Sequence, residues 1–335
     1  MQNNQLEFFE TQNNGLTPSY KKEGVKPKNY TFIDLFAGIG GIRQGFSQFF
    51  GECVFSSEWD KFSQQTYQAN FGHTPAGDIT EIPPSSIPDF DILLAGFPCQ
   101  PFSNAGHKKG FSDTRGTLFF NILEIAKQHL PKVIFLENVK GFKSHNKGDT
   151  FQTVKQSLED IGYKVYSKIL NAKNFGVPQN RERIYIIAFI DDVDFEYPLT
   201  LDKPVKVGDI LAPKVEEKYT ISDKLWAGHQ RRKKAHKAKG NGFGYSMFNA
   251  NSAYTSTISA RYYKDGSEIL IEQKGKNPRK ITPREAARLQ GFPEDFIIPV
   301  SDTQAYRQFG NSVSVPVITE LAKSIYNSLN KKYDQ

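Results

Sequence analysis

Short apolar runs alternate with amphipathic stretches along most of the chain. Runs of strand length occupy residues 30–36, 52–57, 92–95, 132–139 and 183–189. The stretches between them place apolar residues three or four positions apart, which is the spacing of a helix with one buried face. Strands that alternate with helices in this way predict an α/β fold around a mainly parallel sheet.

Two further strands extend this pattern. We predict a short strand that ends at Gly77-Asp78-Ile79 and a longer one over 163–170. The turn at 174–178 would join the longer strand to 183–189 as a hairpin, which places one antiparallel strand in the sheet. Helices are expected at 42–49, 118–129 and 149–160, from Thr282 onward, and up to about Leu329.

The strand at 92–95 leads into a stiff loop, Gly96 to Pro101, that contains Cys99 between two prolines. The prolines make the chain leave the strand as an extended segment. The Cys99 thiol would then lie at the carboxyl end of a central strand, where open α/β sheets bind ligands. Gly, Ser, Asn and Lys through residue 110 predict a lid. A lone cysteine is more commonly a small buried apolar residue, but the residues around this one favour chemistry.

Charged residues lie at the ends of two later strands. Glu137 closes an apolar strand, and a buried carboxylate is costly unless it is paired or functional. Because the strands that end at Glu137 and Cys99 would be neighbours, we expect the two side chains to be close. Arg181 and Arg183 would face the same side at a strand start and suit phosphate or carboxylate groups. The simpler alternatives are a helix-capping or surface Glu137 and ion pairs of the arginines with Glu182.

A glycine loop between the first strand and the first helix predicts a nucleoside site. The loop 37–41 would let a ligand approach a helix N-terminus, but Arg43 replaces the third glycine of a dinucleotide-binding loop. Glu58 follows the first glycine by 20 positions and could bind ribose hydroxyls. Trp59 could stack on adenine or pack in the core, and Asp78 could bind the base amino group. An adenosyl group without pyrophosphate indicates S-adenosylmethionine.

Composition narrows the class of protein. The chain has 335 residues and two cysteines, which excludes a disulfide framework and fits a reducing cytoplasm. We expect no membrane span and no signal peptide. The formal net charge is +7, and residues 201–280 hold 17 Lys and Arg against 8 Asp and Glu, which leaves the remainder near −2. One basic region on a nearly neutral body suggests a nucleic-acid face, with a solvated charged insertion as the alternative.

Regular alternation stops between about residues 191 and 277. Prolines, the basic cluster 231–237 and polar loops at 240–245 and 255–263 predict a small, mostly β domain that presents loops to a groove. The expected domains are a poorly ordered N-terminal extension over 1–28, a catalytic and cofactor-binding domain over 29–190, this small domain over 191–277, and a return to the catalytic domain over 278–330.

Five short motifs occur in one order along the chain. They are Asp34-Leu35-Phe36-Ala37-Gly38, Pro98-Cys99-Gln100, Glu137-Asn138-Val139, Gln179-Asn180-Arg181-Glu182-Arg183 and Gly310-Asn311-Ser312-Val313. In this order and spacing they resemble the bacterial DNA cytosine-5 methyltransferases of type II restriction-modification systems, from about Tyr30 to Leu329. The resemblance implies a seven-stranded, Rossmann-like sheet that binds S-adenosylmethionine, with an inserted, smaller and mostly β target-recognition domain.

The same resemblance implies the partners and the setting. The substrate would be double-stranded DNA, and no membrane or metal ion would take part. A cognate restriction endonuclease would be a functional but not a physical partner. We expect a monomer in the cytoplasm.

The expected chemistry follows from the properties of cytosine, whose C5 is a weak nucleophile. Addition of the Cys99 thiolate to C6 would activate C5. Glu137 would hold N3, while Arg181 and Arg183 hold the carbonyl oxygen and orient the site. The base must first be flipped out of the duplex. Cofactor contacts are expected from Asp34, Phe36, Ala37, Gly38, Gly40, Gly41, Glu58, Trp59, Asp78, Ile79, Pro98, Leu118, Asn311 and Val313, and DNA contacts from Gln100, Ser103, Thr257, Arg261 and Tyr262.

Three other functions stay open at this point. A transfer-RNA cytosine methyltransferase would use the same Cys and Glu, but the basic insertion favours DNA. A catalytically silent DNA-binding module is disfavoured because Cys99, Glu137 and both arginines are present. A nicotinamide oxidoreductase is disfavoured by Arg43. The recognised base sequence is not predictable from these residues.

Overall fold

The computed structural model describes residues 30–98, 118–201, 203–242 and 244–333. These residues belong to two compact units. The sheet unit comprises the described residues of Val25–Asn171, Glu182–Leu199 and Val317–Gln335, and the second unit comprises those of Ala172–Arg181 and Thr200–Pro316. No helix in these ranges is long and apolar enough to cross a membrane.

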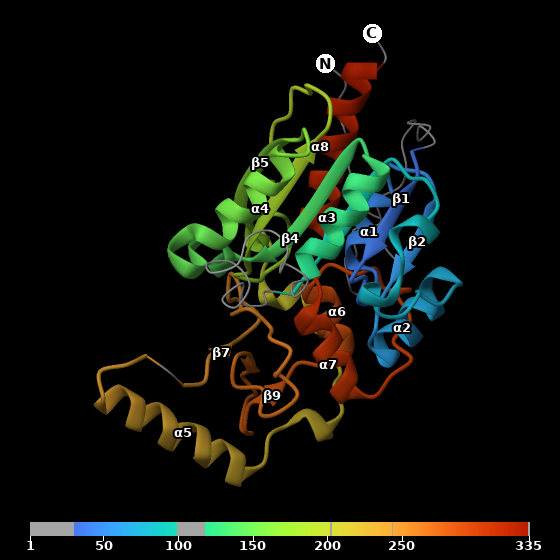
Figure 1. Cartoon of the computed structure of the whole chain (residues 1–335). Coiled ribbons are helices and arrows are strands. Elements are labelled where there is room, and N and C mark those ends of the chain that lie inside the picture. Colours follow the sequence, from blue (N-terminus) through green and yellow to red (C-terminus); the bar gives the residue numbers. More distant parts are fainter. Residues whose placement is uncertain (1–29, 99–117, 202, 243, 334–335) are drawn as a thin grey trace. The chain divides into compact units, whose positions relative to one another are not determined.

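The sheet unit is built on a mixed sheet of six described strands in the order β2-β1-β3-β4-β6-β5 (Figure 1). The first four strands in this order are parallel, and β6 is antiparallel to both of its neighbours. The predicted hairpin and its antiparallel strand are thus confirmed. The strands are β1 Phe32–Leu35, β2 Cys53–Ser57, β3 Ile92–Gly96, β4 Val133–Val139, β5 Lys164–Asn171 and β6 Glu182–Phe189.

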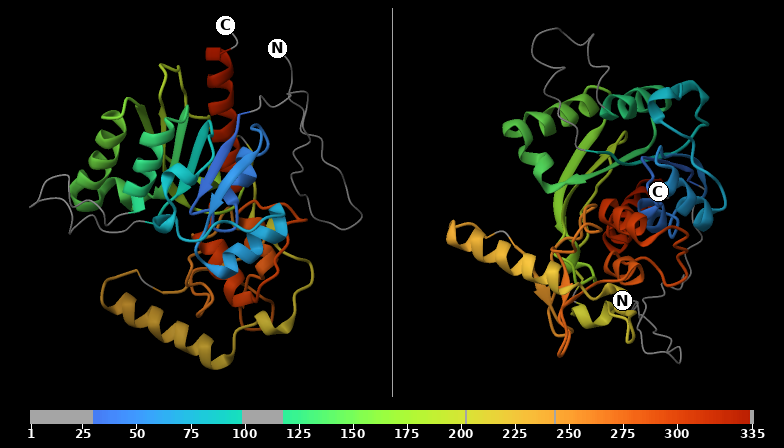
Figure 2. Two further views of the ribbon diagram at one scale, coloured as in Figure 1. Left: turned by 45° about the vertical axis from the view of Figure 1, so that its right-hand side comes forward. Right: turned by 90° about the horizontal axis from the view of Figure 1, so that it is seen from below.

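Helices cover both faces of this sheet (Figures 1 and 2). Ile33, Leu93 and Ile134 point to the face where α3 and α4 pack. On the other face Phe46 of α1 meets Phe135 with ring centroids 5.0 Å apart. Because both faces are covered, the central strands are continuously apolar rather than alternating. The helices of this unit are α1 Gly41–Phe46, α2 Lys61–Phe71, α3 Leu118–His129, α4 Asp149–Glu159 and the α8 residues from Val317 onward.

A close contact joins α1 to α8, which spans Val315–Tyr333. A Cβ built on Gly45 would lie 2.6 Å from Ile318 Cγ2 and 2.9 Å from the backbone nitrogen of Thr319. Only glycine allows the two helices to approach this closely. The α8 side chains Leu321 and Ile325 are fully buried, so the element that follows the second unit in the sequence completes the core of the sheet unit.

The strand expected at 77–79 is not formed, and this accounts for six described strands where seven were expected. Ala76 makes a single parallel bridge to Ser57. Asp78 then caps a short 3₁₀ helix, Ile79–Glu81, by accepting a hydrogen bond from the Thr80 backbone at 2.9 Å. Asp and Gly favour turns over strands, so a segment with one apolar residue forms a bridge and a cap.

The sequence predicted a mostly β domain over 191–277. The second unit, which contains most of these residues, has little strand. Its sheet has three strands of two residues each: β7 Met247–Phe248, β8 Leu270–Ile271 and β9 Arg279–Lys280. The longest element among its described residues is instead the 16-residue helix α5, Asp223–Ala238. Two further helices are α6 Pro283–Leu289, with Thr282 and Glu285 forming a capping box, and α7 Asp302–Asn311.

Candidate active site at the carboxyl edge of the sheet

The carboxyl ends of β1, β2, β3 and β4 meet at one edge of the sheet unit, because these strands are parallel. Leu35 lies opposite Ser57 and Ala95, and Gly96 lies opposite Glu137. Open α/β sheets bind ligands at this edge. Most of the site residues predicted in the sheet unit are found here.

Glu137 and Arg183 form a mostly buried ion pair at this edge. Arg183 Nε lies 3.2 Å from Glu137 Oε1, and the two side chains are 16% and 11% exposed. A Cβ on Gly96 would lie 3.6 Å from Glu137 Oε2, so the carboxyl group rests against the end of β3. The strands β3 and β4 are neighbours, as predicted, and the expected proximity of the Glu137 and Cys99 side chains stays a prediction. Cys99, three residues further along the chain, lies outside the described residues, as do Gln100 and Ser103.

Asn138 fixes the first residues that follow β3. Its Nδ2 donates to the carbonyl of Phe97 at 2.9 Å, and both residues are buried. Since side chains alternate along a strand, Asn138 and Glu137 point to opposite faces of β4. Asn138 was expected only as part of a motif, without a role of its own. Its position directly after a strand-ending carboxylate was the available signal.

Arg181 makes different contacts from Arg183. It belongs to the second unit, is 2% exposed, and donates to the carbonyls of Ile258 and Gly310 at 3.2 Å each and to that of Ser312. Two of these carbonyls flank Asn311. The described contacts of Arg181 therefore position the segment that carries Asn311 and Val313.

The glycine loop after β1 has an unusual backbone. Phe36 has a φ of 54°, and Gly38 and Gly40 have φ values of 56° and 81°. A bulky residue in this left-handed region is strained, at a cost of about 1–3 kcal/mol, and such strain clusters at functional sites. A Cβ on Gly38 would meet no atom within 4 Å. The loop is thus held in a costly shape beside open space.

Glu58 and Trp59 lie beside this loop at the end of β2. Glu58 accepts backbone hydrogen bonds from Gly38 and Asp60, each at 2.8 Å, and burial raises its pKa. A carboxylate offers about four acceptor sites, so acceptor capacity remains for a ligand hydroxyl. Trp59 is 78% exposed, so it does not pack in the core.

Asp34 lies in a buried polar cluster and has no exposed surface. Tyr67 donates to Asp34 Oδ2 at 3.4 Å and accepts from Arg43 Nη1 at 3.0 Å. Burial raises the pKa of Asp34 to about 8. Arg43 also stacks on Phe71, with its Cζ 4.3 Å from the ring centroid. Arg43, the residue that breaks the dinucleotide pattern, therefore donates to the buried Tyr67 hydroxyl, a structural role that the sequence did not predict.

The other predicted cofactor residues of the sheet unit differ in exposure. Ala37 donates its backbone N–H to Ser57 at 2.9 Å. Ile79 is buried, Asp78 is half-buried and Pro98 is exposed. Gly41 and Leu118 are the first residues of α1 and α3.

The residues predicted to contact DNA occupy different depths in the second unit. Thr257 is half-buried and donates to the carbonyl of Asn180 at 2.6 Å, and Arg261 is exposed. Tyr262 is fully buried, and its hydroxyl donates to Ile269 and accepts from Ile281. The side chain of Tyr262 thus packs the interior of the unit, and Arg261 is the neighbour that reaches the surface. Asn311 is exposed and Val313 is buried.

Residues 30–327 match the family described as C-5 cytosine-specific DNA methylase. The chain belongs to this family. It is 62% identical over 310 residues to the Type II methyltransferase M.NlaX of Neisseria lactamica, an alignment that covers 91% of this chain and 99% of the relative. It is 49% identical to the Type II methyltransferase M.HpaII of Haemophilus parainfluenzae, covering 92% of each chain. The chain is thus a DNA cytosine methyltransferase of the restriction-modification type.

Solved structures agree on the fold. The Entamoeba histolytica methyltransferase EhMeth gives a TM-score of 0.75 at 23% identity, covering 90% of this chain and 99% of that one. The S. pombe Dnmt2 methyltransferase gives 0.75 at 21% identity, covering 91% and 100%. At this identity the likeness establishes the α/β methyltransferase fold alone.

Proposed function

We propose that the protein transfers a methyl group from S-adenosylmethionine to C5 of a cytosine that is flipped out of duplex DNA, with Cys99 bonded to C6 during the reaction. The observation that carries this proposal is the buried Glu137–Arg183 contact against the end of β3, the strand that leads to Cys99. Family membership supplies the reaction class.

The residues around the glycine loop fit an S-adenosylmethionine site. Glu58 would bind the ribose hydroxyls with its remaining lone pairs, and the exposed ring of Trp59 would stack on adenine. The open space over Gly38 would admit the methionine part of the molecule. Asp78, Ile79, Asn311 and Val313 would complete the site, and Arg181 would act by positioning Asn311.

Each catalytic residue has one task in the proposed reaction. The Cys99 thiolate forms a bond to C6, and the C5–C6 electron pair becomes available at C5. Glu137, oriented by Arg183, holds N3 and limits the charge on the ring. Bound S-adenosylmethionine would supply the methyl group: C5 would bond to the methyl carbon, and the pair of the broken carbon–sulfur bond would stay on sulfur as a neutral thioether. Loss of the C5 proton then expels Cys99 as a thiolate and restores the ring.

Replacement of Cys99 by alanine tests this assignment. We expect Cys99→Ala to bind S-adenosylmethionine as the wild type does and to transfer no tritiated methyl group to duplex DNA. Detectable methylation by this variant would contradict the covalent step. Bisulfite sequencing of DNA from expressing cells would identify the target. A parallel assay on transfer RNA should show no incorporation.

The finer assignments belong to the same proposal. We propose that residues 191–277 form the target-recognition domain and that the enzyme acts as a monomer in the cytoplasm. A cognate restriction endonuclease would share its recognition sequence without binding it. A single sedimenting species at the mass of one chain would support the monomer, and a dimer would contradict it.

A further inference from the structure

Helix α5 is attached to the second unit by one narrow face. His229 is 1% exposed, and its Nε2 lies 3.1 Å from the carbonyl oxygen of Asp265. Trp226 packs edge-on against Tyr245, with ring centroids 4.8 Å apart. These positions, three apart, lie on one face of the helix. Most of the remaining surface of α5 faces solvent.

The segment from Asp223 to Lys239 holds seven Lys and Arg residues against one acidic residue, a net +6 in a chain of formal charge +7. Two of the cations serve the unit itself. Arg232 Nη2 lies 2.9 Å from Asp265 Oδ2, and Lys233 Nζ lies 4.1 Å from the centroid of the Tyr245 ring. The remaining cations are exposed, and they form no ion pair with the described residues. They are Lys224, Arg231, Lys234, Lys237 and Lys239.

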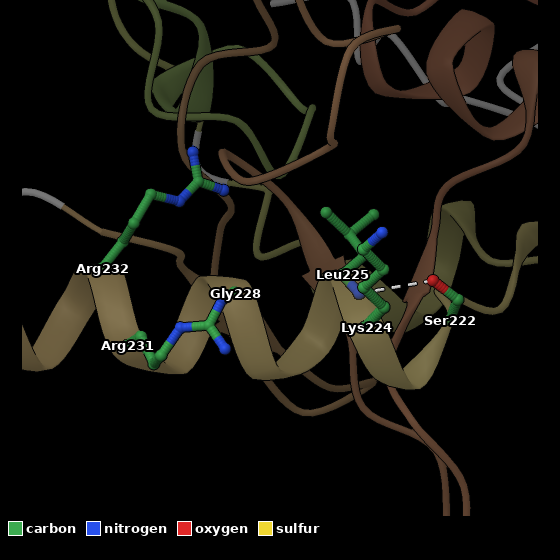
Figure 3. Close-up of a pocket in the computed structure, with 6 residues that line it drawn as sticks. All are labelled: Ser222, Lys224, Leu225, Gly228, Arg231 and Arg232. Atoms are coloured by element: carbon green, nitrogen blue, oxygen red, sulfur yellow. Dashed lines mark hydrogen bonds between the residues drawn. The ribbon is translucent and has the colours of Figure 1, made fainter.

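Three of these exposed cations lie on the same side of the helix. Lys224, Arg231 and Lys234 are separated by seven and three positions, which are close to whole turns of 3.6 residues. A hollow of about 540 Å³ lies between Lys224 and Arg231 (Figure 3). We call it the α5 hollow; it is lined by Ser222, Lys224, Leu225, Gly228, Arg231 and Arg232.

Gly228 is the residue of the α5 hollow that packing does not explain. A Cβ at this position would meet no atom within 4 Å, so alanine would fit without strain. Glycine in a helix interior costs about 1 kcal/mol relative to alanine. Its effect here is to leave bare backbone between Lys224 and Arg231, where another molecule can come close. A merely solvated charged face would not need this glycine.

We propose that the α5 hollow, together with Lys234, binds DNA backbone phosphates outside the recognised base pairs. This inference rests on the proposed function, because it assumes a DNA substrate. The cations span ten residues, or about 15 Å of helix, over which one DNA strand carries about four phosphates. Arginine binds phosphate through two parallel hydrogen bonds, and such contacts position a protein without reading bases.

The test uses the full chain and two unmethylated duplexes that contain the target sequence identified by bisulfite sequencing. One duplex has about 12 base pairs and the other about 30. Each cation that releases a counterion contributes about 0.9 to the slope of log affinity against log salt. We expect Lys224→Ala and Arg231→Ala each to lower this slope by about that amount on the long duplex. On the short duplex the slope should not change.

Lys237→Ala is the matched control. It removes the same charge from the same helix about 120° away from Arg231. We expect it to leave both slopes unchanged. If Lys237→Ala and Arg231→Ala lower the slope equally, net charge explains the effect and the α5 hollow does not. If the variants weaken binding to a transfer-RNA probe but not to the long duplex, the partner of this face is RNA and the proposal is wrong.

Gly228→Ala separates binding from folding. We expect its melting temperature to rise by roughly 2 °C, since alanine favours the helix, while its affinity for the long duplex falls several-fold. Unchanged affinity in this variant would overturn the proposal. Methyl transfer by the wild type to the short duplex is measured alongside, and its absence would refute the proposed function instead.

Discussion

Each unit contains an arginine–glutamate pair with little solvent exposure. The two pairs differ in their exposed fraction and in their contact geometry. In the second unit Glu285 and Arg279 meet through two parallel contacts of 2.8 Å, and their side chains are 0% and 8% exposed. In the sheet unit Arg183 Nε lies 3.2 Å from Glu137 Oε1, and the two side chains stay 16% and 11% exposed.

The surroundings of the two carboxylates also differ. Glu285 also accepts backbone hydrogen bonds from Ala212 at 2.8 Å and from Thr282 at 2.7 Å, so protein donors surround it. Glu137 rests at the strand edge where ligands bind in α/β sheets. The Glu285–Arg279 pair has the contacts of a structural pair, whereas the Glu137–Arg183 pair lies at the edge of the sheet where the proposed reaction would take place.

Glu137→Gln gives the largest expected effect. Loss of the carboxylate should lower kcat by about 10²–10⁴-fold, the typical contribution of general acid–base catalysis. Its melting temperature should change little, because a partly exposed pair contributes less to folding. Single-turnover methyl transfer and a thermal melt measure the two quantities. An unfolded variant would mean that this pair is structural.

Glu285→Gln should show the reverse. It leaves Arg279 buried without its counterion, which destabilises a protein by about 3–5 kcal/mol. The methyl-transfer rate per folded molecule should stay at the wild-type value. Urea unfolding and active-site titration measure these effects. A large loss of kcat with unchanged unfolding would remove the distinction between the pairs.

Asp34 is a third buried carboxyl group. Its titration should make the free energy of unfolding of the protein depend on pH. Its folded pKa is raised to about 8 by burial, whereas an unfolded Asp titrates near 3.9. Between these values the folded state holds a proton that the unfolded state lacks. The free energy of unfolding should therefore fall as pH rises, by up to about 1.4 kcal/mol per pH unit, and level off above about pH 8.

Asp34→Asn should remove this decline, because the amide does not titrate. Melting temperatures of both proteins at pH 5.5 and pH 8.5 test the effect. Equal pH profiles would show that Asp34 is ionised in the folded protein throughout this range.

Trp59→Ala should give the smallest change. Since the side chain is 78% exposed, stability should stay within about 0.5 kcal/mol. Loss of stacking should weaken S-adenosylmethionine binding by about tenfold, since aromatic–base stacking contributes about 1–3 kcal/mol. Calorimetric titration measures the affinity. A lower melting temperature with unchanged affinity would assign Trp59 to packing.

The sheet was predictable where apolar runs were long. The run at 132–139 produced β4 with Glu137 near its end, and the turn near Pro178 preceded an antiparallel β6. Near residues 77–79 the turn-forming Gly77 and Asp78 leave only a single bridge, at Ala76, and a cap. In these cases local sequence and tertiary structure favour the same conformation.

The second unit was harder to predict because its main helix has few apolar residues. In α5 the large apolar residues are Leu225 and Trp226. The basic cluster that follows them shows no apolar spacing from which a helix could be predicted. The contacts of Arg181 depend on carbonyls 77 to 131 residues away in the sequence. No local pattern could distinguish it from Arg183.

The packing of α8 against α1 can form only late in synthesis, because α8 lies near the end of the chain. Ribosomes add roughly 5–20 residues per second, and Thr200–Pro316 must be translated before Val317 emerges. For roughly ten seconds the apolar side of α1 that receives Ile318 has no covering helix. The nascent sheet unit therefore exposes an unfinished core, and we expect a chaperone that holds apolar surfaces to raise the yield of active enzyme.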